Sequence, residues 1–89
     1  MSNKHLPVQE KVNKLVSLYE KNLLQEALIE AKSLANQHPN VPVIYNIYGV
    51  INIALGNWNQ SANCFSNAIK LRTDYVEAHH NLGIALDNL

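Results

Sequence analysis

The residues that could carry chemistry in this 89-residue chain are four histidines and a single cysteine. Two histidines that bind one metal ion from a helix stand four residues apart, and no pair among His5, His38, His79 and His80 has that spacing. The side chains of His79 and His80 would point about 100° apart in a helix. We expect His79 to be a packing residue and His80 to face a ligand. The histidines therefore predict neither a metal site nor a cofactor.

Cys64 has no Lys or Arg within one helical turn that would lower the pKa of its thiol, so we expect a packing residue. A lone cysteine also excludes an internal disulfide framework. The sequence has no glycine-rich phosphate loop and no G-x-S-x-G motif. These observations predict that the chain is not an enzyme in itself.

Charge and composition argue against two further classes of partner. Seven basic residues oppose seven acidic ones, and the formal net charge is zero, so the basic surface typical of nucleic-acid-binding proteins is missing. The chain has no apolar run long enough to cross a membrane as a helix, and its first residues lack the apolar stretch of a signal peptide. We therefore expect a cytoplasmic protein that binds neither nucleic acid nor membrane.

Apolar residues recur at three- and four-residue intervals along the rest of the chain, which is the spacing of amphipathic helices. The expected helices are Val8 to Lys21, Leu24 to about Gln37, Pro42 to about Leu55, Trp58 to about Leu71, and a last one that continues to Leu89. Asn40 is expected to cap the third helix, with Pro42 in its first turn. Asp74 is expected to cap the fifth helix, with Glu77 completing a capping box.

The helices also repeat at the spacing that separates Gly49 from Gly83, and we call this spacing the repeat period. A shift by the repeat period places Asn22 on Gly56, and both residue types suit the left-handed conformation of a tight helix–helix turn. Other pairs keep their chemical character: Leu24 and Trp58, Ala27 and Ser61, Ala31 and Phe65, Leu34 and Ala68, and Tyr48 and Leu82. Hairpins of two helices that recur in this way stack into an array.

This pattern resembles the tetratricopeptide repeat (TPR) family over residues 8–89. The residues of the middle unit that carry the resemblance are Tyr45, Tyr48, Gly49, Gly56, Trp58, Phe65 and Ala68. The resemblance implies an all-α fold, a right-handed α-solenoid of five helices in antiparallel hairpins. It divides the chain into an N-terminal tail (1–7), a first repeat (8–41), a second repeat (42–75) and the first helix of an incomplete third repeat (76–89).

In the family that the chain resembles, the first helix of each repeat lines a concave groove that binds a peptide or partner segment. The corresponding residues form a largely apolar stripe with polar edges. They are Val12, Asn13, Val16 and Tyr19 in the first unit, Asn46, Ile47, Val50 and Ile53 in the second, and His80, Asn81 and Ile84 in the third. The resemblance thus predicts a protein–protein interaction module.

One kind of ligand is not expected in that groove. Family members that hold a C-terminal carboxylate use Lys, Asn and Arg side chains at five places. Those places read Val12, Val16, Ile47, Glu77 and Asn81 here, so carboxylate capture is not predicted.

The last helix carries an apolar stripe for which the sequence supplies no cover: Leu82, Ala85, Leu86 and Leu89. Three explanations stay open. The chain is the first part of a longer array, the helix pairs with its copy in a homodimer, or the helix itself acts as a cap. The resemblance to TPR proteins leaves two alternative functions open. One is a recruiting or regulatory arm of a longer bacterial enzyme, transferase-like, with its catalytic part beyond residue 89, and the other is a self-association unit.

Overall fold

The computed structural model describes residues 6–89, and these residues fold into five α-helices. The helices are α1 (Val8–Glu20), α2 (Leu24–Gln37), α3 (Pro42–Ala54), α4 (Trp58–Leu71) and α5 (Val76–Asp87). The expected all-helical fold is therefore confirmed, and every helix lies within a few residues of its predicted range. Residues 1–5, which include His5 and most of the predicted tail, lie outside the described part.

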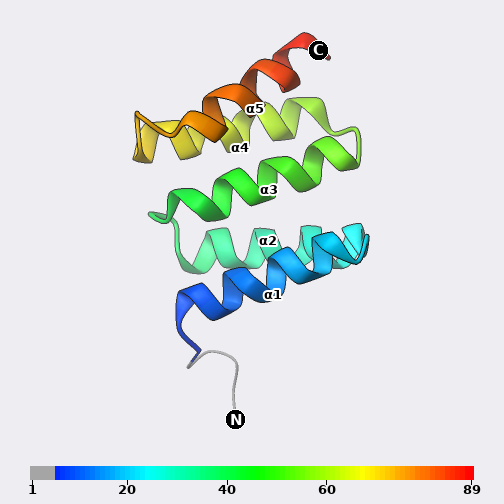
Figure 1. Ribbon diagram of the computed structural model, residues 1–89, viewed down its shortest axis with the longest axis vertical. Coiled ribbons are helices and arrows are strands. Elements are labelled where there is room, and N and C mark those ends of the chain that lie inside the picture. Colours follow the sequence, from blue (N-terminus) through cyan, green and yellow to red (C-terminus); the bar gives the residue numbers. More distant parts are fainter. Residues whose placement is uncertain (1–5) are drawn as a thin grey trace.

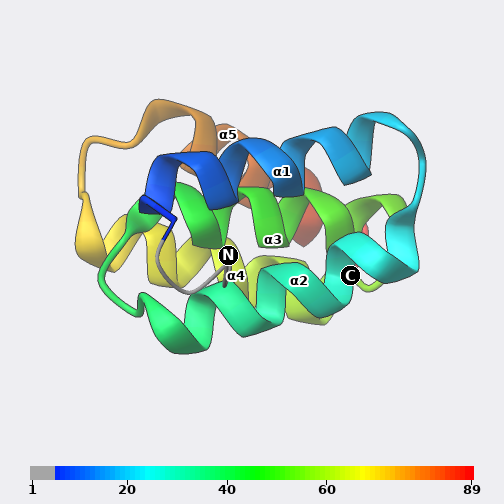
Figure 2. The same cartoon turned by 90° about the horizontal axis from the view of Figure 1, so that it is seen from below.

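Consecutive helices run antiparallel and stack in sequence order along the long axis of the molecule (Figure 1). Seen along that axis, α1, α3 and α5 form one layer, and α2 and α4 form the other (Figure 2). The molecule measures 43 × 27 × 17 Å along its principal axes. This is the arrangement expected when helical hairpins can bury their apolar faces only against each other.

The two hairpin turns are built alike, as the repeat period predicts. Asn22 and Gly56 adopt left-handed backbone conformations, with φ of 61° and 76°. In each turn the next amide closes a bond to a carbonyl near the end of the preceding helix: Leu23 N donates to Leu18 O at 3.0 Å, and Asn57 N donates to Asn52 O at 2.8 Å. Such bonds satisfy carbonyl groups that a helix end would otherwise leave unpaired.

The starts of α3 and α5 differ from the prediction. Val41, in extended conformation, is the N-cap of α3, and Tyr75 is the N-cap of α5; neither cap makes a side-chain hydrogen bond. Val41 lies directly before Pro42 and is therefore held in the extended conformation of an N-cap. Asn40 precedes this N-cap by one residue and does not cap α3. Asp74 caps nothing either; its carboxylate lies 3.4 Å from the Arg72 guanidinium at the surface.

The core lies between the two layers. Its main cluster joins the first hairpin to α3 through Val12, Leu15, Ala27, Ala31, Leu34, Ala35, Ile44 and Ile51. A second cluster of Ala68, Tyr75 and Ala78 joins α4 to α5. Phe65 is fully buried, and its ring packs against the backbone of α3 at Gly49. A Cβ atom at Gly49 would lie 2.7 Å from Phe65 Cζ, so only glycine fits there without a shift.

Candidate binding face

The side of the α1–α3–α5 layer that faces away from α2 and α4 is the candidate binding face. In α3, Gly49 and Asn52 face α4, while Ile44 and Ile51 are buried toward the first hairpin. Helical geometry leaves the remaining side to the half-buried Val43, Ile47 and Val50 and the exposed Ala54. We call the surface that these residues form with their equivalents in the first and third units the inner face.

The inner face is apolar in the middle and polar at both ends. In the first unit the equivalent residues are Gln9, Asn13, Val16 and Glu20, and in the third they are Glu77, Asn81, Ile84 and Asn88. Gln9 Nε2 donates to Asn13 Oδ1 at 3.0 Å, which lines up two amides along the exposed side of α1. Val16, Val50 and Ile84 occupy one repeat position and form an apolar row across the three helices, with Ile84 37% exposed.

Two residues predicted to line the groove are instead buried. Val12 is 3% exposed and Asn46 is 5% exposed. These residues share a repeat position that points toward the first helix of the following hairpin, so the neighbouring helix covers them. Asn46 meets α5 there, and its Oδ1 accepts a hydrogen bond from Asn81 Nδ2 at 3.2 Å. His80 has the same position in α5 and is exposed, since no further helix follows among residues 6–89.

Other predicted groove residues contribute less exposed surface than the prediction implies. Val16, Tyr19 and Ile47 are half-buried and pack against the main core cluster. Val50 and Ile53 are half-buried, whereas Asn13 and His80 are exposed. Much of the inner face is therefore formed by half-buried side chains.

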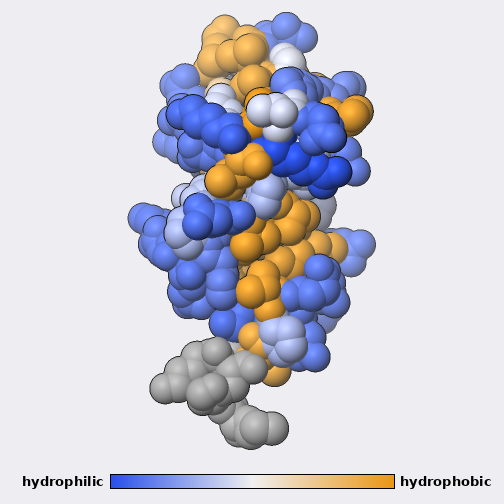
Figure 3. Space-filling view, turned by 90° about the vertical axis from the view of Figure 1, so that its left-hand side faces the viewer, coloured by the Kyte–Doolittle hydropathy of each residue, from blue (hydrophilic) through white to orange (hydrophobic). Residues whose placement is uncertain are grey.

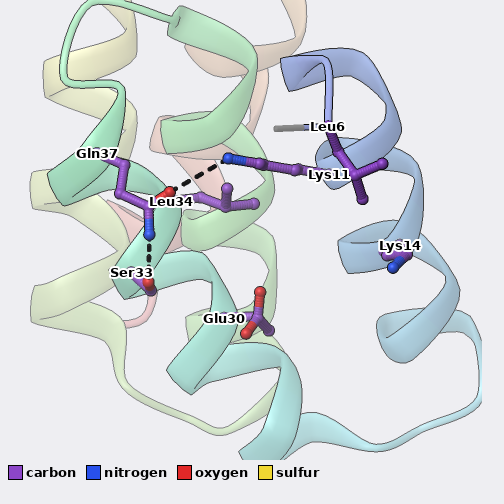
Figure 4. A pocket seen from close by; sticks show the side chains of 7 residues that line it. All are labelled: Leu6, Lys11, Lys14, Glu30, Ser33, Leu34 and Gln37. Carbon is purple, nitrogen blue, oxygen red and sulfur yellow. Dashed lines mark hydrogen bonds between the residues drawn. The ribbon is translucent and has the colours of Figure 1, made fainter. Parts of the chain in front are cut away.

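Two surface hollows lie elsewhere. A hollow of about 200 Å³ opens between α1 and α2 and is lined by Leu6, Lys11, Lys14, Glu30, Ser33, Leu34 and Gln37. Figure 4 shows Lys11 reaching across it, where Nζ donates to Gln37 Oε1 at 3.5 Å and Gln37 Nε2 donates to Ser33 Oγ at 3.1 Å. None of the predicted groove residues lines this hollow.

A second hollow of about 240 Å³ lies at the equivalent place of the second hairpin, between α3 and α4. Its lining residues are Tyr45, Tyr48, Gln60, Asn63, Cys64 and Asn67. Several of them follow lining residues of the first hollow by one repeat period, with Tyr45 at the place of Lys11 and Cys64 at the place of Glu30. The repeat thus builds the same depression twice, with charged walls in the first hairpin and uncharged walls in the second. Neither hollow was predicted, because both lie on the side of the hairpins away from the predicted groove.

Apolar surface also reaches the edge of the molecule at which α1, α3 and α5 begin. Figure 3 shows a band of apolar residues there, running along the long axis between hydrophilic flanks. Half-buried residues at the helix starts on this edge include Val8 and Val43.

Of the residues considered for chemistry, Cys64 is buried and His79 lies at the surface. Burial raises the pKa of the Cys64 thiol to about 11, so the thiol is neutral at physiological pH, and Asn52 Nδ2 lies 3.7 Å from its sulfur. His79 is exposed rather than packed, and its Nε2 lies 2.8 Å from the Thr73 carbonyl oxygen. Among residues 6–89, no three His, Cys, Asp or Glu side chains are grouped to hold a metal ion, and no helix is both long and apolar enough to cross a membrane.

The apolar stripe predicted on the last helix contains both buried and exposed residues. Ala85 is fully buried on the side of α5 that faces the rest of the protein, so it cannot belong to a self-association surface. Leu82 is half-buried, while Leu86 and Leu89 are 53% and 61% exposed. The prediction is wrong at Ala85 because consecutive residues of a helix point about 100° apart, so the stripe spans two different sides of α5.

These features define a class: a repeat protein of α-helical hairpins, five helices packed in sequential pairs, with one open face on the layer of first helices. The comparison with protein families agrees, since the family model described as TPR repeat matches residues 49–89. Residues 49–89 therefore match a TPR repeat, as the sequence pattern predicts. A search of curated proteins found no match. TPR repeats are general protein–protein interaction modules, so the match indicates protein partners without specifying them.

Proposed function

We propose that the chain binds a protein segment through its inner face, and that the segment presents two or three apolar side chains to α3. The observation that carries this proposal is the change in polarity along the face. Val43, Ile47, Val50 and Ala54 leave the middle uncharged and apolar, whereas the equivalent residues of α1 and α5 include Glu20 and Glu77. An apolar patch with a polar rim is typical of surfaces that bind protein.

The contacts of the face suggest how such a segment would be oriented. Asn13 on α1 and Asn88, which follows α5, are exposed, and both belong to the polar ends of the inner face. They would pair with backbone groups of the segment, while Val50 and Ile84 would contact its side chains. The formal net charge of zero gives no reason to expect a strongly charged ligand.

We also propose that the chain acts by binding rather than by catalysis. The support is chemical: the one thiol is buried and neutral at physiological pH, and a neutral thiol is a poor nucleophile.

Selection from a displayed library of random peptides tests the binding proposal. We expect the enriched peptides to share apolar residues and to bind the chain in a saturable way. The variant Ile84→Asp should lose most of this binding, because a buried unpaired carboxylate is strongly unfavourable. Ile84 is preferred to Ile47 for this purpose because Ile47 also packs against the core.

Ile29→Asp is the matched control, since Ile29 is 70% exposed and lies on α2 in the opposite layer. It makes the same chemical change away from the inner face, and it should leave binding unchanged. Equal losses in both variants, or selected peptides without apolar residues, would show that the inner face is not the binding site.

A further inference from the structure

The two ends of the inner face differ in the polar groups that they offer to a bound segment. Asn13, Ile47 and Asn81 share one repeat position in α1, α3 and α5. Another repeat position, one turn nearer to the helix starts, holds Gln9 in α1 and Glu77 in α5. The apolar middle of the face is therefore flanked by two amides on one side and by an amide and a carboxylate on the other.

The α5 end presents two hydrogen-bond acceptors. Asn81 Nδ2 donates to Asn46 Oδ1 at 3.2 Å, and Asn46 is buried. This bond turns the planar amide of Asn81 so that its Oδ1 points away from Asn46. The oxygen has no hydrogen-bond partner among residues 6–89 and is open to solvent. Glu77 is exposed, and no basic side chain of the described residues lies within ion-pair distance of its carboxylate.

The α1 end of the same rows is uncharged and offers a donor. Gln9 Nε2 donates to Asn13 Oδ1 at 3.0 Å, so Nδ2 of the exposed Asn13 stays available as a donor. The acidic residue of the inner face in α1, Glu20, lies about 10 Å along the helix from Asn13. Glu77 lies only about 6 Å along its helix from Asn81. The negative charge close to these rows is therefore at the α5 end.

The middle of the face favours a helical ligand over an extended one. Val43, Ile47, Val50 and Ala54 have no side-chain group that could pair with a backbone. An extended segment lying on them would bury unpaired N–H and C=O groups, which is unfavourable. A helix pairs these groups internally and leaves unpaired only the N–H groups of its first turn and the C=O groups of its last turn. A helix therefore needs polar partners only at its two ends.

The width of the face suits a short helix. α3 lies between α1 and α5 in their layer and contacts both (Figures 1 and 2). Packed helices lie about 8–10 Å apart, so the face spans about 16–20 Å from α1 to α5. A helix of about 11–13 residues has this length.

We propose that the inner face binds an amphipathic helix of a partner protein in one direction, with its first turn at α5 and its last turn at α1. The free N–H groups of the first turn and the positive end of the helix dipole meet Asn81 Oδ1 and the Glu77 carboxylate. The free C=O groups of the last turn accept from Asn13 Nδ2. Apolar side chains of the helix rest on Ile47 and Val50. The reverse direction would bring free C=O groups against two acceptors.

This inference rests on the proposed function and adds the conformation and the direction of the ligand. The test uses the whole chain and an isotope-labelled peptide from the library selection whose binding Ile84→Asp abolishes. Backbone chemical shifts of the bound peptide report its conformation, and we expect a helix. A nitroxide on the first residue of the peptide should broaden the NMR signals of Glu77 and Asn81 most strongly. A nitroxide on its last residue should broaden the signal of Asn13 most strongly.

Two matched variants of the chain test the charge at the α5 end. Glu77→Gln should weaken peptide binding by about two- to fivefold at low salt, the usual effect of one charge beside a helix terminus. This loss should shrink as the salt concentration rises. Glu20→Gln makes the same chemical change on the same face, away from the first turn of the ligand, and should leave the affinity unchanged. Circular dichroism during urea unfolding checks that both variants are folded.

The possible failures distinguish this inference from the proposed function. If no selected peptide depends on Ile84, the inner face is not the binding site and both proposals are wrong. If the peptide depends on Ile84 but binds in extended form, only the helical ligand is wrong. Reversed or equal broadening by the two labels, or equal losses in Glu77→Gln and Glu20→Gln, would contradict the direction. A dimer in sedimentation runs without peptide, with inner-face amides shifting as chain concentration rises, would overturn the inference because a second copy then occupies the face.

Discussion

Helices α3 and α5 occupy the same place in two successive units, yet one is enclosed and the other is half-open. α3 contacts α1, α2, α4 and α5, whereas α5 packs only against α3 and α4 within residues 6–89. The difference is visible at one repeat position. The Phe65 ring fills the space over Gly49, whereas none of the described residues fills the space over Gly83. The same residue type in the same register is therefore a packing requirement in α3 and an unoccupied contact in α5.

The difference also explains why the two helices carry different residues at the next position of that face. Asn52 is 2% exposed in α3, and its amide is satisfied locally: Nδ2 donates to the Tyr48 carbonyl at 3.2 Å, and Oδ1 accepts from Asn57 Nδ2 at 3.1 Å. A buried amide needs such partners. Its equivalent Leu86 has no polar group to satisfy and is more than half exposed. At this repeat position α3 thus buries a polar residue, whereas α5 exposes an apolar one.

The largest expected effect concerns the ring that encloses α3. Phe65→Ala should lower the free energy of unfolding by about 3–5 kcal/mol, the usual range for removing a fully buried aromatic side chain. In a domain of this size such a loss leaves little net stability. Urea unfolding followed by circular dichroism at 222 nm measures it. The surface variant Ile29→Ala should stay within about 0.5 kcal/mol of the unchanged chain. A loss below about 1 kcal/mol for Phe65→Ala would mean that α4 does not seal α3 through this ring.

A smaller effect, with opposite signs at the two glycines, tests the comparison directly. Gly49→Ala should destabilise the chain by about 1–3 kcal/mol, because the new methyl group overlaps the Phe65 ring. Gly83→Ala should stabilise it by up to about 1 kcal/mol, because alanine favours the helix and its methyl group meets no atom. Thermal and urea unfolding of both variants measures the difference. Changes of equal sign would show that the two positions are not distinguished by packing.

Most of the fold could be predicted because it depends on local patterns. The apolar spacing sets the five helices, and the residues at Asn22 and Gly56 fit the left-handed turns that end the first helix of each hairpin. The repeat period predicted which residues are equivalent. These features depend on backbone preferences and on one-dimensional spacing, and both are readable without knowing any neighbour.

The candidate site was predicted less well because exposure depends on neighbours. The family resemblance places Val12 and Asn46 in the groove, but the helix of the next unit covers them. The repeat predicts that His79 packs like its equivalent Tyr45, yet Tyr45 is half-buried by its surroundings and His79 is exposed. The repeat position of a residue predicts the direction of its side chain. Whether a neighbouring helix covers that side chain depends on how the hairpins stack.

The smallest expected effect is confined to alkaline pH and concerns the thiol at the α3–α4 contact. Burial raises the pKa of Cys64 from 9.0 to about 11, so the folded state keeps its proton where the unfolded chain loses it. The unfolded state then binds fewer protons than the folded state between these two values, and stability falls as pH rises through them. At pH 8 the contribution is negligible, and at pH 10 the loss is about 1 kcal/mol. Burial also raises the pKa of Tyr48 and of Tyr75, so the whole chain loses stability in the same direction. Urea unfolding at pH 8 and pH 10 of the chain and of its Cys64→Ala variant isolates the thiol, since only the variant lacks this titration. If the chain and the variant show the same pH dependence, the thiol is exposed to solvent. The contact between α3 and α4 is then looser around Cys64 than around Phe65.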